Sequence, residues 1–197
     1  EFRRVLFRSR INTTAKETTE IISALLLLSR APEKLDAPQT SINSIAINEA
    51  QRLNYLLKYK SVTCTIIAEQ VYFTNVRPEL LKMALGNLIK NAFQYTDDGE
   101  VIITIDSDKI VVTDTGLGIP ESMMPLLYER FERLEHSNTD GKTDDNSSTD
   151  KAFSNKVEGS GLGLSIVQRI MTHMDWELTH QANKTGGSSF SRSEEHT

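Results

Sequence analysis

The stretch Asp114-Thr115-Gly116-Leu117-Gly118-Ile119-Pro120 decides the fold of this chain. The β-branched run at residues 109–113 precedes it and predicts a strand that ends in one carboxylate and a Gly-x-Gly turn. Because glycine has no side chain, the backbone of such a turn can come close to a ligand. The stretch therefore predicts a binding edge at the end of a β-sheet, and the bland alternative is a tight turn.

A second glycine stretch, Gly159-Ser160-Gly161-Leu162-Gly163-Leu164-Ser165, lies further along the chain. It opens a predicted helix that begins at residue 162, because Leu162, Ile166 and Ile170 recur at helical spacing. The first turn of a helix has free N–H groups and the positive end of the helix dipole, which suits phosphate. The second stretch therefore predicts a phosphate cradle.

Two more stretches accompany the glycines. Upstream lies Asn87-Leu88-Ile89-Lys90-Asn91-Ala92-Phe93-Gln94-Tyr95-Thr96, and between the glycine stretches lies Tyr128-Glu129-Arg130-Phe131-Glu132-Arg133-Leu134. In chain order, the four stretches resemble the N, G1, F and G2 boxes of the sensor histidine kinases, which belong to the GHKL (Bergerat-fold) class of ATPases. The resemblance covers residues 41–190, and four ordered boxes make it specific.

Strands and helices interleave along the chain. They predict an α/β (α+β) two-layer sandwich with a mixed, mostly antiparallel sheet and helices on one face. Between the boxes, residues 136–158 are polar and almost free of apolar side chains, which indicates a long mobile ATP lid over about residues 119–160. Helices are predicted at residues 11–30, 45–59, 78–95 and 162–173, and strands at 61–68, 71–73, 101–105, 109–113, 176–181 and 188–190.

The chain is expected to consist of four segments. Residues 1–9 and 192–197 resemble translated sequencing adapter, so we expect neither to belong to the fold and we expect the reading frame to be cut on both sides. Residues 10–35 are expected to form the end of a dimerisation helix and its linker. Residues 41–191 are expected to form the ATP-binding catalytic domain.

The predicted helix at residues 11–30 carries an apolar stripe of Ile21, Ile22, Leu25 and Leu28. The resemblance implies that this helix ends a dimerisation hairpin and packs in a four-helix bundle of a homodimer. The alternative is a helix that packs on its own domain.

Composition limits the other functions. The chain carries a net charge of −5, which argues against a nucleic-acid partner. Its one cysteine, Cys64, excludes a disulfide framework and is expected to be a buried strand residue. The longest apolar run, residues 24–28, is too short to span a bilayer.

Asn87 and Asn91 are the candidate magnesium ligands. They lie one helical turn apart, so both amides face the same way, and amide oxygens can bind Mg²⁺ while ATP phosphates supply the charge. The resemblance assigns Mg²⁺ chiefly to Asn91. Related hydrolytic ATPases carry a glutamate base at the position of Asn87, so the amide favours phosphoryl transfer over hydrolysis.

The resemblance also implies the nucleotide site. It assigns Asp114 to the adenine amino group and Arg133 to the γ-phosphate. Gln94 departs from the family, which often has a phosphate-binding lysine there. The remaining implied contacts are Tyr95, Gly116 and Gly118 at the base, Phe131 as the lid anchor, and Gly159, Gly161, Leu162 and Gly163 at the phosphates.

The phosphoacceptor histidine of the family is missing. None of His136, His173, His180 and His196 lies in a His-Glu-x-x-x-Pro context, so we expect a fragment that binds ATP but cannot phosphorylate itself. The resemblance implies a protein-histidine kinase that passes phosphate through a dimerisation domain to the receiver domain of a response regulator. It further implies a cytoplasmic domain of a parent anchored in the inner membrane. The alternatives are an ATP-hydrolysing GHKL domain and a degenerate, non-enzymatic interaction module.

Overall fold

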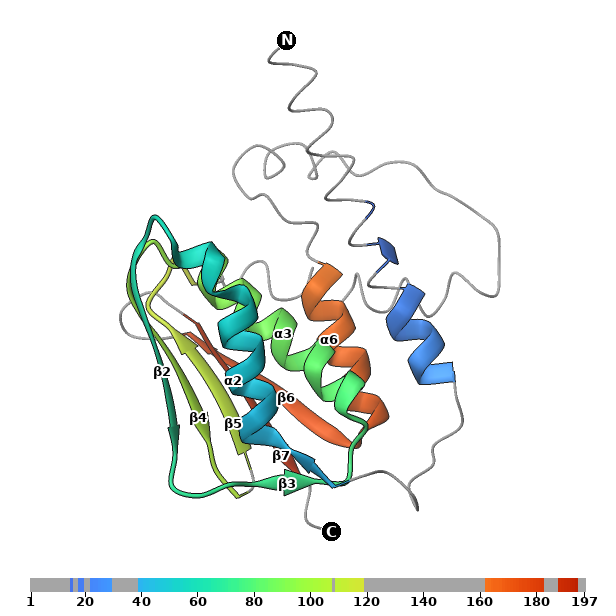
Figure 1. The fold of residues 1–197 in the computed structure, drawn as a ribbon. Helices are drawn as coiled ribbons and strands as arrows, with labels where there is room; N and C mark the ends of the chain where they lie inside the picture. The colour runs from blue at the N-terminus through green and yellow to red at the C-terminus, as the bar shows by residue number, and fades with distance from the viewer. Residues whose placement is uncertain are drawn as a thin grey trace.

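The computed structural model describes residues 15, 18, 19, 22–29, 39–107, 109–118, 162–182 and 188–194. Within these ranges a β-sheet and a layer of helices form a two-layer α/β sandwich (Figure 1). The helices are α2 (Ile42–Leu53), the 3₁₀ helix η1 (Asn54–Leu57), α3 (Pro78–Tyr95) and α6 (Leu162–His173). The strands are β1 (Thr40–Ser41), β2 (Ser61–Ala68), β3 (Phe73–Thr74), β4 (Asp98–Ile105), β5 (Lys109–Asp114), β6 (Trp176–Ala182) and β7 (Ser188–Glu194).

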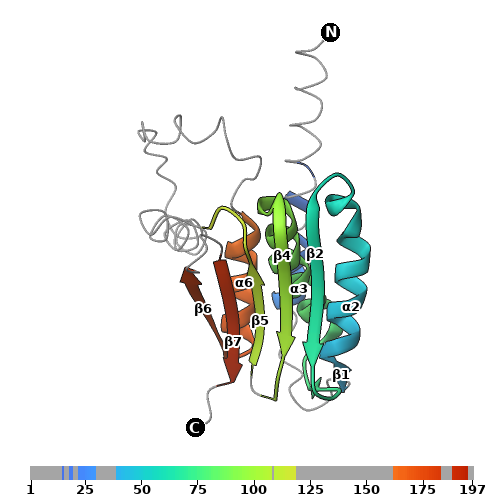
Figure 2. The ribbon, with the colours of Figure 1, turned by 90° about the vertical axis from the view of Figure 1, so that its left-hand side faces the viewer.

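The main sheet has the strand order β2-β4-β5-β7-β6. β2 pairs with β4 in parallel, and the remaining neighbours in this sheet are antiparallel. Figure 2 shows α2, α3 and α6 on the same face of this sheet. The predicted mixed, mostly antiparallel sheet with helices on one face is therefore confirmed.

α3 is the central helix of the layer and lies between α2 and α6 (Figure 1). It runs over the residues that the sequence predicted, with Pro78 in its first turn, where the missing N–H costs nothing. Ten of its residues are buried, and eight of these belong to the hydrophobic core. α3 is therefore the buried centre of the helical layer.

α2 starts earlier than predicted. Its N-cap is Ser41, whose Oγ accepts the N–H of Ser44 at 3.2 Å, so the helix begins at Ile42 and not at Ile45. The chain then tightens into the 3₁₀ helix η1 before β2. The second predicted strand, residues 71–73, is also shifted, because the pairing of β1 with β3 uses Phe73 and Thr74.

β2 agrees with the sequence, whereas Cys64 is a strand residue as expected but is half-buried and not buried. β2 covers the predicted residues, with Val62, Cys64 and Ile66 half-buried and their neighbours exposed. Burial raises the pKa of the Cys64 thiol above its usual value.

Residues 22–29 are helical, and one face of them packs on the domain. Ala24 is buried in the core cluster, and Leu27 and Leu28 lie against that cluster. Ile22 and Leu26 are more than half exposed. The segment thus makes contacts with its own domain, which was the alternative to packing in a dimer. Its role in a homodimer remains a prediction.

β7 extends further than predicted. The sequence placed the last strand at residues 188–190 and set residues 192–197 aside, whereas β7 continues to Glu194. Arg192 pairs with Ile110, and Ser193 pairs with Lys109. Because β7 has a strand on each side, backbone hydrogen bonding alone can keep these residues in the sheet.

Candidate functional site

The turn that follows β5 is folded around Asp114. This carboxylate is buried, and its Oδ1 accepts the N–H of Gly116 at 2.9 Å. The N–H of Leu117 donates to the carbonyl oxygen of Tyr95, at the end of α3, at 3.2 Å. Gly118 has φ of 66°, a left-handed conformation that favours glycine. The first glycine stretch is therefore attached to the C-terminal end of α3.

Gly116 has a packing reason to be glycine. A Cβ atom there would overlap the carbonyl oxygen of Tyr95 and lie 2.8 Å from Oγ1 of Thr96. The Thr96 hydroxyl is buried, and no hydrogen-bond partner for it is present among the described residues. The sequence predicted close approach of this backbone to the adenine. The structure shows close approach to α3.

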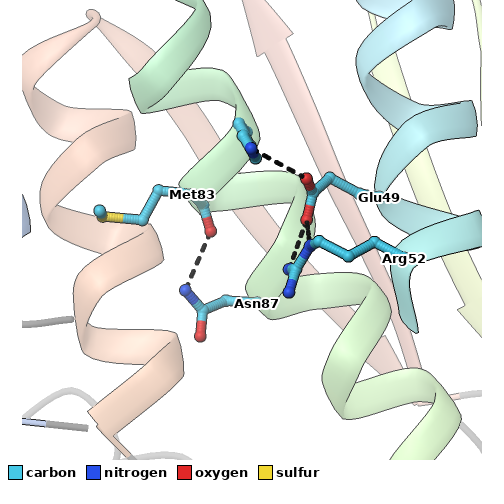
Figure 3. A network of polar contacts seen from close by, with 5 residues as sticks. Glu49, Arg52, Met83 and Asn87 are labelled. Carbon is cyan, nitrogen blue, oxygen red and sulfur yellow. Dashed lines mark hydrogen bonds and ion pairs between the residues drawn. The ribbon is translucent and has the colours of Figure 1, made fainter. Parts of the chain in front are cut away.

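Asn87 points from α3 toward α6 (Figure 3). Its Nδ2 donates to the carbonyl oxygen of Met83 at 2.9 Å, which fixes the orientation of the amide. A Cβ atom on Gly163 would lie 2.9 Å from Oδ1 of Asn87. The predicted N and G2 boxes therefore touch, and glycine at position 163 is what allows this contact.

Asn91 and Tyr95 follow Asn87 at intervals of one helical turn. Both are partly exposed, whereas Asn87 is buried. The row formed by these three residues leads along α3 from the contact with α6 to the contact with the Gly116 turn. The structure thus brings together the described members of the predicted site.

The remaining predicted contacts lie outside the described residues. They include the predicted lid at about residues 119–160, its hydrophobic anchor, the predicted γ-phosphate contact and two of the predicted phosphate-binding glycines. Leu162 is described only as the first residue of α6. The predictions outside the described part are Phe131, Arg133, Gly159 and Gly161.

An ion-pair network around the buried carboxylate of Glu49 lies on the other side of α3 and was not predicted (Figure 3). Glu49 of α2 is 2% exposed and accepts a hydrogen bond from Nε of Arg52 at 2.8 Å. Nζ of Lys82 lies 4.0 Å from its other carboxylate oxygen. A Cβ atom on Gly86 would lie 2.8 Å from Oε2 of Glu49. The signals for this network were an acidic residue in an apolar helical stripe and a glycine inside a helix.

His180 on β6 lies within electrostatic reach of Asp114. Burial lowers the pKa of His180, and the negative charge of Asp114 opposes this shift. In the described part of the chain, no group of three or more His, Cys, Asp or Glu side chains could hold a metal ion.

The residues present fit a nucleotide with a hard cation. Nδ2 of Asn87 is engaged by Met83, and among the described residues Oδ1 receives no hydrogen bond. A neutral amide oxygen suits Mg²⁺ when phosphates supply the negative charge. The carboxylate of Asp114 is an acceptor of the kind that an exocyclic amine requires. Asn87 lies at one end of the row on α3, and the turn that follows Asp114 contacts Tyr95 at the other end.

The comparison with protein families gives a match over most of the described domain. Residues 76–193 match the family described as histidine kinase-, DNA gyrase B-, and HSP90-like ATPase. The match includes both glycine stretches and the helix between α2 and α6.

Curated relatives are sensor kinases of much greater length. Hybrid signal transduction histidine kinase D of Dictyostelium discoideum is 28% identical, over 89% of this chain and 11% of that protein. The sensory/regulatory protein RpfC of Xanthomonas campestris is 28% identical over 94% of this chain and 27% of its own length. Sensor protein CreC of Escherichia coli is 26% identical over 92% of this chain and 36% of its own length. The chain thus spans between about a tenth and about a third of these relatives.

Solved structures share the fold. The cytoplasmic segment of histidine kinase QseC aligns with a TM-score of 0.57 and 20% identity, over 92% of this chain and 95% of that one. Full-length ShkA in complex with AMPPNP aligns with a TM-score of 0.61 and 18% identity, over 90% of this chain and 34% of that one. At these identities the likeness concerns the fold.

Proposed function

This chain belongs to the family of histidine kinase-, DNA gyrase B-, and HSP90-like ATPases, and from that premise we propose that it is the ATP-binding catalytic domain of a sensor histidine kinase in two-component signalling. The whole protein would transfer the γ-phosphoryl group of ATP to a histidine and then to an aspartate of a response regulator. The observation that carries this proposal is that α3 joins the two glycine stretches: Gly163 packs on Asn87 in the middle of α3, and the Gly116 turn packs on its C-terminal end.

The described residues would bind and orient the nucleotide. The carboxylate of Asp114 would accept a hydrogen bond from the adenine amino group, while its contact with the Gly116 N–H holds the turn in place. Tyr95, Gly116 and Gly118 would line the base. Gly163 at the start of α6 would let the phosphates approach the helix N-terminus.

Asn91 and Asn87 would hold the cation. Both are neutral amides on one face of α3, and Asn87 is already oriented by Met83. When bound, Mg²⁺ neutralises phosphate charge in phosphoryl transfer. Asn87 cannot accept a proton from water as a glutamate would, which favours transfer to a histidine over hydrolysis.

The undescribed boxes complete the proposed site by resemblance alone. Phe131 would anchor the lid, and Arg133 would contact the γ-phosphate. Gly159, Gly161 and Leu162 would continue the phosphate cradle toward Gly163. These assignments extend the proposal that the described residues support.

The proposed partners lie outside this chain. They are a dimerisation domain with the acceptor histidine, through which the parent would form a homodimer, and a receiver domain of a response regulator. No described helix is long and apolar enough to cross a membrane. We propose that this domain is cytoplasmic and that its parent is anchored in the inner membrane, and the likeness to the cytoplasmic segment of histidine kinase QseC supports this proposal.

Transfer in trans tests the proposal. The chain is incubated with Mg²⁺ and ATP labelled on the γ-phosphate, with a dimerisation domain whose acceptor histidine is present or replaced by glutamine. We expect acid-labile phosphate on the histidine-containing domain and none on the chain itself. Phosphate on the chain would contradict the expected lack of an acceptor. Rapid release of inorganic phosphate without the acceptor domain would instead indicate a hydrolase.

A further inference from the structure

Lys60 lies between η1 and β2, far from α3 in the sequence, yet its ammonium group reaches the end of α3. Its Nζ donates to the carbonyl oxygens of Phe93 at 2.9 Å, Gln94 at 2.7 Å and Thr96 at 2.9 Å. It also lies 3.0 Å from the carboxylate of Asp97. The side chain of Lys60 is 20% exposed, so these contacts are largely shielded from water.

The end of α3 needs such a partner. The last carbonyl groups of a helix have no N–H one turn ahead, and they form the negative end of the helix dipole. α3 has no basic residue in its last turn, and its C-cap residue, Thr96, is extended instead of left-handed. The usual glycine closure is therefore missing. Lys60 supplies both the charge and the hydrogen bonds from another part of the chain.

The carbonyl groups at the end of α3 also bind the turn that follows Asp114. Between the carbonyl groups that bind Lys60, the carbonyl oxygen of Tyr95 accepts the N–H of Leu117 at 3.2 Å. Gly116 packs directly on Tyr95 and Thr96. A displaced helix end would therefore displace the turn that holds Asp114.

We propose that Lys60 is a positioning residue of the nucleotide site: its ammonium group binds the carbonyl groups of Phe93, Gln94 and Thr96 and so fixes the end of α3, and through the intervening Tyr95 carbonyl it fixes the Asp114 turn. The inference deepens the proposed function and rests on it for the link to ATP. A lysine suits this role because its three N–H donors match the three carbonyl groups that converge on it.

Lys60→Met removes the donors and the charge while keeping most of the side-chain volume. Lys58→Met is the matched control, because Lys58 belongs to the same connection, is exposed, and lies over the ring of Tyr59 with Nζ 5.3 Å from its centroid. Two quantities are measured on the whole chain: amide hydrogen exchange without nucleotide, and the affinity for Mg²⁺-ATP by calorimetry. Exchange at Leu117 is normalised to the amides of the β4–β5 ladder, so a uniform loss of stability cancels.

In Lys60→Met we expect normalised exchange at Leu117 to rise roughly tenfold and ATP affinity to fall roughly tenfold, the effect of losing a hydrogen bond to a charged group. We expect Lys58→Met to match the wild type. If Lys60→Met does not fold, Lys60→Gln, which keeps an uncharged N–H₂ donor, is measured in its place, with a smaller change of the same sign.

Unchanged Leu117 exchange relative to the ladder would overturn the positioning role, even if the whole domain became less stable. Faster Leu117 exchange with unaltered ATP affinity would overturn the link between the turn and the nucleotide. If the folded wild type binds no ATP, the proposed function fails, whereas the exchange measurement still decides whether Lys60 holds the turn.

Discussion

A Cβ atom on Gly163 would lie 2.9 Å from the Oδ1 atom of Asn87. This contact joins α3 to the start of α6. The sequence motifs on these two helices are far apart in the chain, and the whole predicted lid lies between them. Glycine at position 163 therefore has a packing role besides the phosphate contact that we propose for it. It also determines where the amide of Asn87, a proposed cation ligand, can lie.

Gly163→Ala is expected to weaken Mg²⁺-ATP binding without destabilising the domain. The new methyl group must displace Asn87, whereas alanine in a helix is favoured over glycine by about 1 kcal/mol. We expect roughly tenfold weaker binding, about 1.4 kcal/mol, with an unchanged or higher melting temperature. Thr172→Ala on an exposed position of α6 is the control, with wild-type affinity. A Gly163→Ala variant with wild-type affinity would contradict the role given to this contact.

Gly116→Ala is expected to destabilise the turn after β5. Its Cβ would overlap the Tyr95 carbonyl oxygen, and neither backbone segment can yield easily. Overpacking of this kind costs about 1–3 kcal/mol, measurable by urea denaturation. Leu117→Ala is the matched substitution one residue on, where the side chain is 82% exposed, and we expect almost no change. Equal stability of the two variants would show that the turn relaxes without cost.

Gly86→Ala is expected to destabilise the domain, against the usual gain for alanine in a helix. The methyl group would lie 2.8 Å from Oε2 of Glu49, which Arg52 holds in place. Combining Gly86→Ala with Glu49→Ala should recover stability relative to the sum of the two single changes, by about 1 kcal/mol or more. Denaturant unfolding of the four proteins in this cycle measures the coupling. If the stability changes of the two substitutions were additive, Gly86 would have no role in positioning Glu49.

Acid is expected to destabilise the domain partly through His180. Burial lowers the pKa of His180 in the folded state below the usual value of about 6.5. The unfolded chain then binds the proton first, so this contribution to stability is present at neutral pH and is lost as the pH falls. Wild type should lose more stability than His180→Gln between about pH 7.5 and about pH 5.5. Identical losses in urea denaturation would contradict this assignment.

The sequence predicted the elements with strong local signals. α3 and β2 have the predicted ends, because Pro78 starts the helix and alternating residues mark the strand. The start of α2 was wrong, because Ser41 was not identified as a cap. The end of β7 was also wrong, because residues 192–194 take part in pairing that depends on neighbouring strands and not on their own side chains.

The motifs of the site could be predicted from the sequence, but the residues that hold these motifs in place could not. Asn87, Asp114 and Gly116 stand in stretches that resemble known boxes, and the structure brings them to one helix. Lys60 binds carbonyl groups 33 to 36 residues away, and Glu49 packs against Gly86 on a neighbouring helix. Such contacts arise from packing between elements, which spacing along the chain does not encode.

Asp114→Asn tests the nucleotide site most directly. The amide keeps an oxygen that can accept the Gly116 N–H, so the turn should persist, but it loses the charge proposed to bind the adenine amino group. Asp106→Asn is the matched control, because Asp106 is also a turn aspartate that accepts a backbone N–H, that of Ser107 at 2.7 Å. Both variants should retain the circular dichroism spectrum of the wild type.

The decisive measurement is calorimetric titration of Mg²⁺-ATP into these three proteins. We expect saturable, Mg²⁺-dependent binding by the wild type and by Asp106→Asn. Affinity should fall at least roughly tenfold in Asp114→Asn, as for the loss of a hydrogen bond to a charged group. A folded wild type that binds no ATP, or an Asp114→Asn variant that binds it as tightly as the wild type, would contradict the proposed nucleotide site.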